Sequence, residues 1–211
     1  MDGKTDFPDE WFQRLKNGDR QALAQLFARE RAALRRMVSW RLDSRLNGRV
    51  DPSDVLQEVY IDAAERIQNY LEKPTMSIGL WLRLLAGRRL FELHRQHLGA
   101  QMRDADLEIS LDQGCWPSTS PECLAAQLTG HLTSPSHAAM RAETEARLIE
   151  ALNRMDAIDR EVLMLRHFEE LNNNDVAALF GIGKAAASNR YVRALKRLRE
   201  VLSGMTDFFG A

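Results

Sequence analysis

The stretch NNDVAALFGIGKAAASNRYVRALKRLREVL, residues 173–202, decides the class of fold. Asn174 is placed to cap a short helix. The apolar residues of that helix are Val176, Ala177, Leu179 and Phe180. Gly181 can take the left-handed conformation that ends a helix, and Ile182 would fill the turn. With a further helix expected from near Lys184, the stretch predicts two helices joined by a tight glycine turn.

The second of these helices separates apolar from basic residues. Its apolar side is Ala187, Tyr191, Leu195, Leu198 and Leu202. Its polar side and leading end carry Lys184, Ser188, Asn189, Arg190, Arg193, Lys196 and Arg197. Helix-turn-helix proteins place the leading end of such a helix in the major groove, where Arg, Asn and Ser reach base edges and other basic residues hold phosphates. We therefore interpret the stretch as a DNA-reading motif, with a charged helical hairpin as the alternative.

Charges are sorted into blocks along all 211 residues, although the net charge is only −1. The segment 29–49 holds seven arginines against two acids, and 83–103 holds five arginines against one. Between them, 51–65 contains Asp51, Asp54, Glu58, Asp62 and Glu65 and no base until Arg66. Basic surfaces separated by an acidic one indicate two contacts, with a polyanion and with a basic partner. Solvated helix faces are the alternative for any single block.

The first hundred residues follow helical periodicity. Apolar residues recur at helical spacing after Asp19, and DPSD at residues 51–54 is a helix start with Asp51 as cap and Pro52 in the first turn. The helix that follows places Val55, Val59, Ala63, Ile67 and Tyr70 on one side and its acids on the other. A third helix is expected from near Leu80 to about Leu98. Since no stretch alternates like a half-buried strand, we expect an all-α fold.

Residues 101–137 are rich in Ser, Thr, Gly and Pro and are expected to form a flexible linker with little regular structure, apart from a helical turn or two at 123–128. Helical periodicity returns after Pro135, with Leu148 and Leu152 in one helix and Ile158, Val162 and Leu165 in the next. We therefore expect two helical domains, 1–100 and 138–211, joined by a linker at 101–137.

Several classes of protein are excluded by what the sequence lacks. The longest apolar run is far too short to span a membrane, and the acidic N-terminus does not resemble a signal peptide, so a cytoplasmic protein is expected. Cys115 and Cys123 are expected to be reduced thiols. His94 and His97 could share a metal, but no third ligand has a suitable spacing, so a solvated or DNA-facing pair is favoured. We therefore expect that the protein is not an enzyme and that it has neither a cofactor nor a metal site.

Taken together, the two halves resemble a bacterial RNA polymerase sigma factor of the small, two-domain extracytoplasmic-function type. Residues 9–100 resemble the sigma region-two domain, and 138–203 resemble region four. The motif DPSDVLQEVYIDAAERI, Asp51–Ile67, is similar to the helix that docks on the clamp helices of the polymerase beta-prime subunit. The residues that this resemblance implies for polymerase binding are Asp51, Asp54, Gln57, Glu58, Tyr60 and Asp62.

The resemblance also implies contacts with promoter DNA. LWLRLLAGRRLFELHRQHL, Leu80–Leu98, resembles the segment that handles the minus-ten element, and the loop 69–79 lies where relatives capture a flipped base. The implied minus-ten residues are Asn69, Tyr70, Arg83, Arg88, Glu92 and Arg95. Trp81 could stack a base, but a core position is favoured. The basic residues of the helix-turn-helix would read the minus-thirty-five element.

Some positions depart from the family pattern. Where many relatives have Ala-Arg-Asn, this chain has Ala86, Gly87 and Arg88, and Ala186 and Ser188 stand where Thr and Lys are frequent. The implied function is a sigma factor that directs core polymerase to promoters and assists their opening. Its implied partners are the beta-prime clamp helices, the beta flap and promoter DNA, with an anti-sigma factor as an optional further one. The alternatives are a dimeric helix-turn-helix regulator, which would bind operator DNA alone, and a protein-binding helical adaptor.

Overall fold

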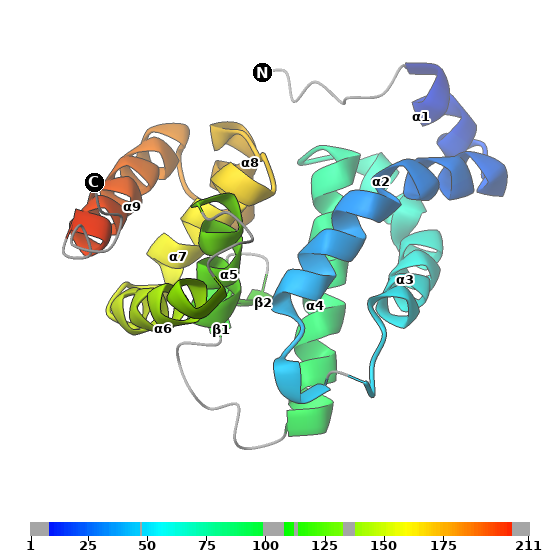
Figure 1. Ribbon diagram of the computed structural model, residues 1–211. Helices are drawn as coiled ribbons and strands as arrows, with labels where there is room; N and C mark the ends of the chain where they lie inside the picture. The colour runs from blue at the N-terminus through cyan, green and yellow to red at the C-terminus, as the bar shows by residue number, and fades with distance from the viewer. Residues whose placement is uncertain (1–8, 47, 99–107, 112–113, 133–137, 204–211) are drawn as a thin grey trace. The chain divides into compact units, whose positions relative to one another are not determined.

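The computed structural model describes residues 9–46, 48–98, 108–111, 114–132 and 138–203 (Figure 1). Helices dominate this part of the chain, so the expected all-α class is confirmed. Two short strands, β1 (Glu108–Leu111) and β2 (Gly114–Pro117), form a two-stranded sheet that periodicity did not predict. The chain divides into two compact units, which are 1–102 with 114–117 (unit 1) and 103–113 with 118–211 (unit 2).

Unit 1 is a helical bundle. Its elements are α1 (Asp9–Lys16), α2 (Arg20–Arg41), the 3₁₀ turn η1 (Ser44–Leu46), α3 (Pro52–Glu72), α4 (Ile78–Leu98) and β2. Helix α4 packs against α2, α3 and β2. The shared core includes Leu26, Leu34, Met37, Leu56, Val59, Leu82 and Leu90, each almost fully buried. Burying such side chains contributes about 1.5 to 3 kcal/mol each, so these helices stabilise one another.

Helices α2 and α3 each begin directly after an aspartate whose side chain caps the helix. The Asp19 carboxylate accepts hydrogen bonds from the backbone N–H groups of Gln21 and Ala22. The expected cap at Asp51 is present, since its side chain accepts from the Ser53 N–H at 2.6 Å and Pro52 lies in the first turn. These bonds satisfy donors that a helix cannot satisfy within itself, and the bond from Ser53 lowers the pKa of the Asp51 carboxyl.

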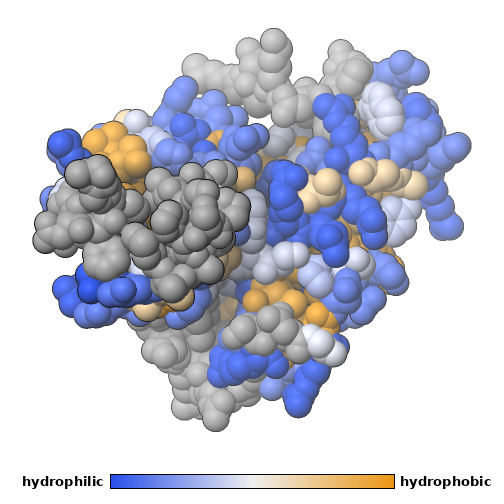
Figure 2. Space-filling model, in the orientation of Figure 1, coloured by the Kyte–Doolittle hydropathy of each residue, from blue (hydrophilic) through white to orange (hydrophobic). Residues whose placement is uncertain are grey.

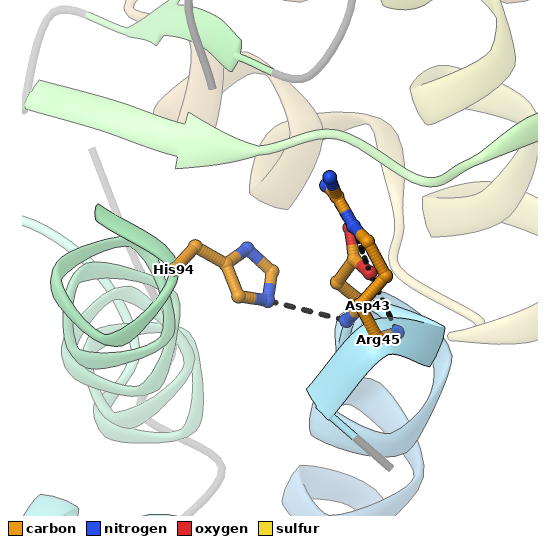
Figure 3. A network of polar contacts seen from close by, with 3 residues as sticks. All are labelled: Asp43, Arg45 and His94. Carbon is orange, nitrogen blue, oxygen red and sulfur yellow. Dashed lines mark hydrogen bonds and ion pairs between the residues drawn. The ribbon is translucent and has the colours of Figure 1, made fainter. Parts of the chain in front are cut away.

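His94 joins α4 to the end of α2 (Figure 3). Its ring is buried, and Nε2 accepts a hydrogen bond from the backbone N–H of Asp43 at 3.3 Å. The Asp43 carboxylate in turn accepts two hydrogen bonds from the Arg45 guanidinium, which lower its pKa. The DNA-facing or solvated role expected for His94 is therefore wrong. His97, one turn further along α4, is exposed.

Unit 2 consists of β1, α5 (Pro121–Leu132), α6 (Ala138–Asn153), α7 (Ala157–Leu163), the π-helical turn η5 (Met164–Phe168), α8 (Asn173–Phe180) and α9 (Lys184–Ser203). Its core includes Leu148, Leu152, Val162 and Leu165, as the periodicity predicted, together with Leu179 and Ala194. The buried guanidinium of Arg160 donates to the carbonyls of Leu152 and Met155 at the end of α6. It thereby satisfies acceptors that the helix end leaves open.

The expected linker contains more regular structure than its composition predicted. Helix α5 packs on α6, and just before α5 the Thr119 N–H and hydroxyl both donate to the buried Glu161 carboxylate at 2.9 Å. Cys123 is a half-buried reduced thiol, while the side chain of Cys115 lies outside the described residues. Polar composition was misleading here because a buried carboxylate on α7 satisfies both donors of Thr119.

His94 predicts a pH dependence of stability. Burial lowers its pKa below the usual 6.5, Arg45 adds to this effect, and Asp43 opposes it. Because the unfolded chain then binds the proton more readily, the contribution of His94 to stability is complete above pH 6.5 and is lost as pH falls toward the folded-state pKa. Thermal unfolding between pH 7.5 and 5.0 should therefore show a steeper loss of stability for the wild type than for His94→Gln.

The matched control is His97→Gln on the same helix, which should keep the wild-type pH profile. An identical profile for His94→Gln and the wild type would show that His94 does not carry this dependence.

Candidate polymerase and nucleic-acid interfaces

The outer side of α3 is acidic. Asp54 and Glu65 are exposed and Asp62 is half-buried, so these carboxylates meet solvent. Glu58 differs, because its carboxylate forms an ion pair with Arg89 of α4. Arg89 also reaches Glu92 at 3.3 Å, and these bonds raise the pKa of its guanidinium. The negative face is thus present, with one of its carboxylates held by the chain's own arginine.

An apolar hollow adjoins this acidic face. It encloses about 360 Å³ between α2 and α3 and is lined by Phe27, Arg31, Ser53, Leu56, Gln57, Tyr60 and Ile61. Tyr60 packs its ring edge-on against Phe27 with centroids 5.2 Å apart. Ile61 is 57% exposed, which is unusual for a large aliphatic side chain. Acids beside an exposed apolar side chain are suited to a partner helix with apolar and basic residues.

The basic block of α2 forms a separate surface. Arg29, Arg31, Arg35 and Arg36 are exposed, and Figure 2 shows hydrophilic residues over most of the visible surface of α2, broken by weakly hydrophobic ones. The acid within this run, Glu30, is turned toward α4, where its carboxylate lies 3.8 Å from the Arg83 guanidinium. The outward side of this helix is therefore cationic.

The predicted minus-ten residues fall into two groups. Asn69, Glu92 and Arg95 are exposed and Arg88 is half-buried, so the side chains of these four reach the surface. Tyr70 is only 7% exposed, and its hydroxyl donates to the Met76 carbonyl at 2.8 Å. Burial raises the pKa of Tyr70 to about 12. Its predicted DNA contact is corrected to a structural role, because its polar atom is already bonded within the loop that it supports.

Arg83 and Trp81 also serve the fold of unit 1. The Arg83 side chain is 12% exposed and faces Glu30. This geometry favours a structural role for Arg83 over the direct DNA contact that was predicted. Trp81 stacks on Tyr70 with ring centroids 4.8 Å apart, in agreement with the core position favoured for it. The two rings fix the end of α3 against the start of α4, which sets the path of the loop 69–79.

Helix α9 presents its polar residues at its leading end. Lys184, Asn189, Arg193 and Lys196 are exposed, and Ser188 and Arg190 are half-buried. On its inner side, Ala187, Ala194 and Leu198 are buried, while Tyr191 is half-exposed and its hydroxyl lies 3.0 Å from Nε2 of His167. Ala194 is fully buried whereas Tyr191 is not, so the buried side of this helix is centred on the smaller residue.

The turn before α9 is confirmed in outline and corrected in one detail. Gly181 adopts φ 61° and ψ 30°, the expected left-handed conformation. The cap of α8 is Asn172 rather than Asn174, since Asn172 accepts from the N–H groups of Asn174 and Asp175 and completes a capping box with Asp175. This arrangement fixes where α8 begins, while Gly181 ends the helix before the turn to α9.

Arg197 was predicted to contact DNA, but it forms an ion pair with Asp159 of α7. The Asp159 side chain is 7% exposed, so Arg197 neutralises a nearly buried carboxylate. The pair joins residues 38 positions apart, and local periodicity carried no signal for it. Arg197 thus has a structural role in this geometry, although its side chain is 46% exposed, whereas Arg193 is exposed on the same helix.

No metal centre accompanies these surfaces in the described part of the chain, where no three His, Cys, Asp or Glu side chains gather. None of the helices described there is long and apolar enough to cross a membrane. The features that this geometry offers are charged and apolar contact surfaces.

Comparisons with known proteins agree with this geometry. A family model described as Sigma-70, region 4 matches residues 145–198, which include α7, η5, α8 and most of α9. The "Probable RNA polymerase sigma factor RfaY" of Xanthomonas campestris pv. campestris is 24% identical over 156 residues, which are 74% of this chain and 35% of that protein. The RNA polymerase sigma factor FliA of Yersinia enterocolitica is 29% identical over 89 residues, 42% of this chain and 39% of that protein.

A solved structure extends the likeness to the fold of nearly the whole chain. The structure of CnrH in complex with the cytosolic domain of CnrY matches 96% of this chain and 99% of that chain, with a TM-score of 0.54 and 20% identity. At that identity it supports the fold alone. The chain spans little more than a third of the length of the two curated relatives. The comparisons therefore support the expected resemblance to bacterial RNA polymerase sigma factors, with residues 145–198 matching region 4 of the sigma-70 family.

Proposed function

We propose that this chain is a promoter-specificity subunit that directs core RNA polymerase to its promoters and assists their opening. One observation carries this proposal: within the stretch matched as sigma-70 region 4, α9 directs an exposed polar and cationic leading end away from its buried side. A helix in that arrangement fits the major groove, where Asn189, Arg190 and Arg193 would contact bases and phosphates of the minus-thirty-five element.

Unit 1 would bind polymerase and the minus-ten element as region two. The beta-prime clamp helices would be contacted by Asp51, Asp54, Gln57, Tyr60 and Asp62. Ile61 would insert into an apolar site on the clamp helices. The support is the adjacency of the acidic outer side of α3 and the apolar hollow. Glu58 would join this contact by exchanging its ion pair with Arg89 for one with a basic residue of the partner. Single-stranded promoter DNA would be faced by Asn69, Arg88, Glu92 and Arg95.

Binding both readers to one polymerase would raise their effective concentration at the promoter, so two weak DNA contacts give a selective complex. Residues 1–100 and 138–211 would serve as the two readers. Such a subunit performs no covalent chemistry, needs no cofactor and acts in the cytoplasm beside the chromosome. A protein that covered the acidic side of α3 would compete with polymerase, which is how an anti-sigma partner would act.

The direct test combines the purified chain with core RNA polymerase and genomic DNA, followed by sequencing of the transcript starts. We expect new starts that share two upstream elements and that are absent with core polymerase alone. If the chain instead bound duplex DNA by itself as a dimer with two half-sites and produced no new starts, it would be a conventional regulator.

The polymerase contact predicts the effect of charge reversal on α3. Asp54→Lys with Asp62→Lys should weaken binding to core polymerase by about tenfold or more, because like charges would face the basic partner helix. Binding is measured by fluorescence anisotropy of the labelled chain. Glu72→Lys is the matched control, since Glu72 is an exposed acid at the far end of the same helix. Equal affinities of the double variant and this control would contradict the docking face.

Substitution of Arg193 and of Arg197 in α9 should separate DNA binding from stability. Arg193→Ala should weaken binding of the holoenzyme to promoter DNA and reduce the salt slope by about 0.9, the value for one phosphate contact. Its thermal stability should stay within about 0.5 kcal/mol of wild type. Arg197→Ala should instead cost about 1 kcal/mol of folding stability, because it leaves the nearly buried Asp159 carboxylate without its ion pair. If Arg193→Ala lowered stability and Arg197→Ala weakened only DNA binding, the roles given to these two arginines would be wrong.

A further inference from the structure

Trp116 of β2 is packed onto α4 within unit 1. Its side chain is 1% exposed, so almost the whole indole is removed from water. Helix α4 and β2 lie against one another, and the ring stands over Gly87, at the position where the sequence departs from the family pattern. The segment that carries Trp116 was expected to be linker, and no local pattern predicted this contact.

The packing explains the glycine. A Cβ atom added at Gly87 would lie 2.5 Å from Cε3 and 3.2 Å from Cη2 of Trp116, and closer still to Cζ3. The first of these separations is shorter than real carbon contacts, and the clashing atoms belong to a rigid ring. Gly87 thus provides a flat floor on the helix, on which a planar ring lies directly against the backbone.

Arg41 is also part of this slot. Its guanidinium carbon lies 5.3 Å from the centroid of the Trp116 ring, within the range of a cation–π contact. The residue is only 4% exposed, although it belongs to the arginine-rich block of α2. Trp116 therefore covers a positive charge that would otherwise extend the cationic surface of that helix toward α4.

A glycine floor and a guanidinium that holds a planar fused ring form a site whose chemistry also suits a nucleobase. Bases stack on planar cationic groups largely without regard to sequence, and a purine has nearly the size and shape of an indole. Arg88 follows Gly87 in the chain and is half-buried on the flank of the same helix, where it can reach the phosphate of such a nucleotide.

We propose that Trp116 is a removable cover on a base-binding slot formed by Gly87 and Arg41. When residues 114–117 leave α4, the slot takes up an unstacked purine of single-stranded DNA. The inference rests on the proposed function, in which unit 1 handles opened promoter DNA. It adds a binding site outside the loop 69–79 and a contact within the chain that keeps this site closed.

A double-mutant cycle tests the contact. In the full chain, Gly87→Ala should lower the unfolding midpoint because the new methyl group collides with the Trp116 ring. In a Trp116→Ala background the same change should raise the midpoint, since alanine favours a helix more than glycine does. A destabilising Gly87→Ala change of equal size in both backgrounds would show that Trp116 does not occupy this floor.

Binding of a labelled oligo-dA single strand, measured by anisotropy with the full chain and no polymerase, tests the slot. Trp116→Ala should bind severalfold more tightly than wild type, because a base can then stack against Gly87 and Arg41 in place of the indole ring. An abasic strand with the same phosphates should lose the gain in affinity. Trp116→Ala with Gly87→Leu should also lose it, because the leucine fills the slot while Arg41 stays in place.

Equal affinity of Trp116→Ala and wild type would overturn the cover, and equal affinity of Trp116→Ala with and without Gly87→Leu would overturn the slot. If Trp116→Ala does not fold, Trp116→Phe supplies the same comparison with a smaller ring and should give an intermediate gain. Because polymerase is absent, failure here leaves the transcription test untouched. Conversely, failure of the transcription test with a positive result here would reject the sigma function alone.

Discussion

Burial of α4 is the constraint on which unit 1 depends. Its apolar side chains are covered by α2 and α3, and Trp116 covers the helix at Gly87. A helix enclosed on so many sides leaves only a narrow strip for polar side chains, and the exposed Glu92 and Arg95 occupy it. Any nucleic acid bound by this helix must approach along that strip or displace a neighbour.

Much of the fold could be predicted from local sequence, because caps and helical periodicity act over one or two turns. The Asp51 cap, the left-handed Gly181 and the separation of charged from buried residues on α3 are of this kind. The error at Asn174 shows the limit of such reasoning. Three consecutive asparagines can each act as a cap, and the choice of Asn172 depends on the reciprocal bond from its own N–H to the Asp175 carboxylate.

What could not be predicted depends on pairs far apart in the chain. Glu58 meets Arg89, Asp159 meets Arg197, and Thr119 meets Glu161 across 31, 38 and 42 positions. A charged residue at helical spacing has the same local signal whether it faces water or a partner from another helix. Periodicity therefore assigned Arg197 to DNA, and only tertiary packing reveals the nearly buried carboxylate that it neutralises. His94 and Tyr70 were misplaced for the same reason, since each is a polar group satisfied by distant or irregular backbone.

The ion pair of Glu58 with Arg89 raises the question of whether the acidic side of α3 is still available to a partner. The Glu58 side chain is 46% exposed, and the pair has access to water. Exposed ion pairs contribute about 0 to 1 kcal/mol, so a guanidinium on a partner can replace Arg89 at small cost. Such an exchange would leave Arg89 paired with Glu92 alone, beside Arg88 on the strip of α4 that is proposed to face DNA. In the proposed function, a partner on α3 would thus change the charge balance of α4 through the ion pair that joins the two helices.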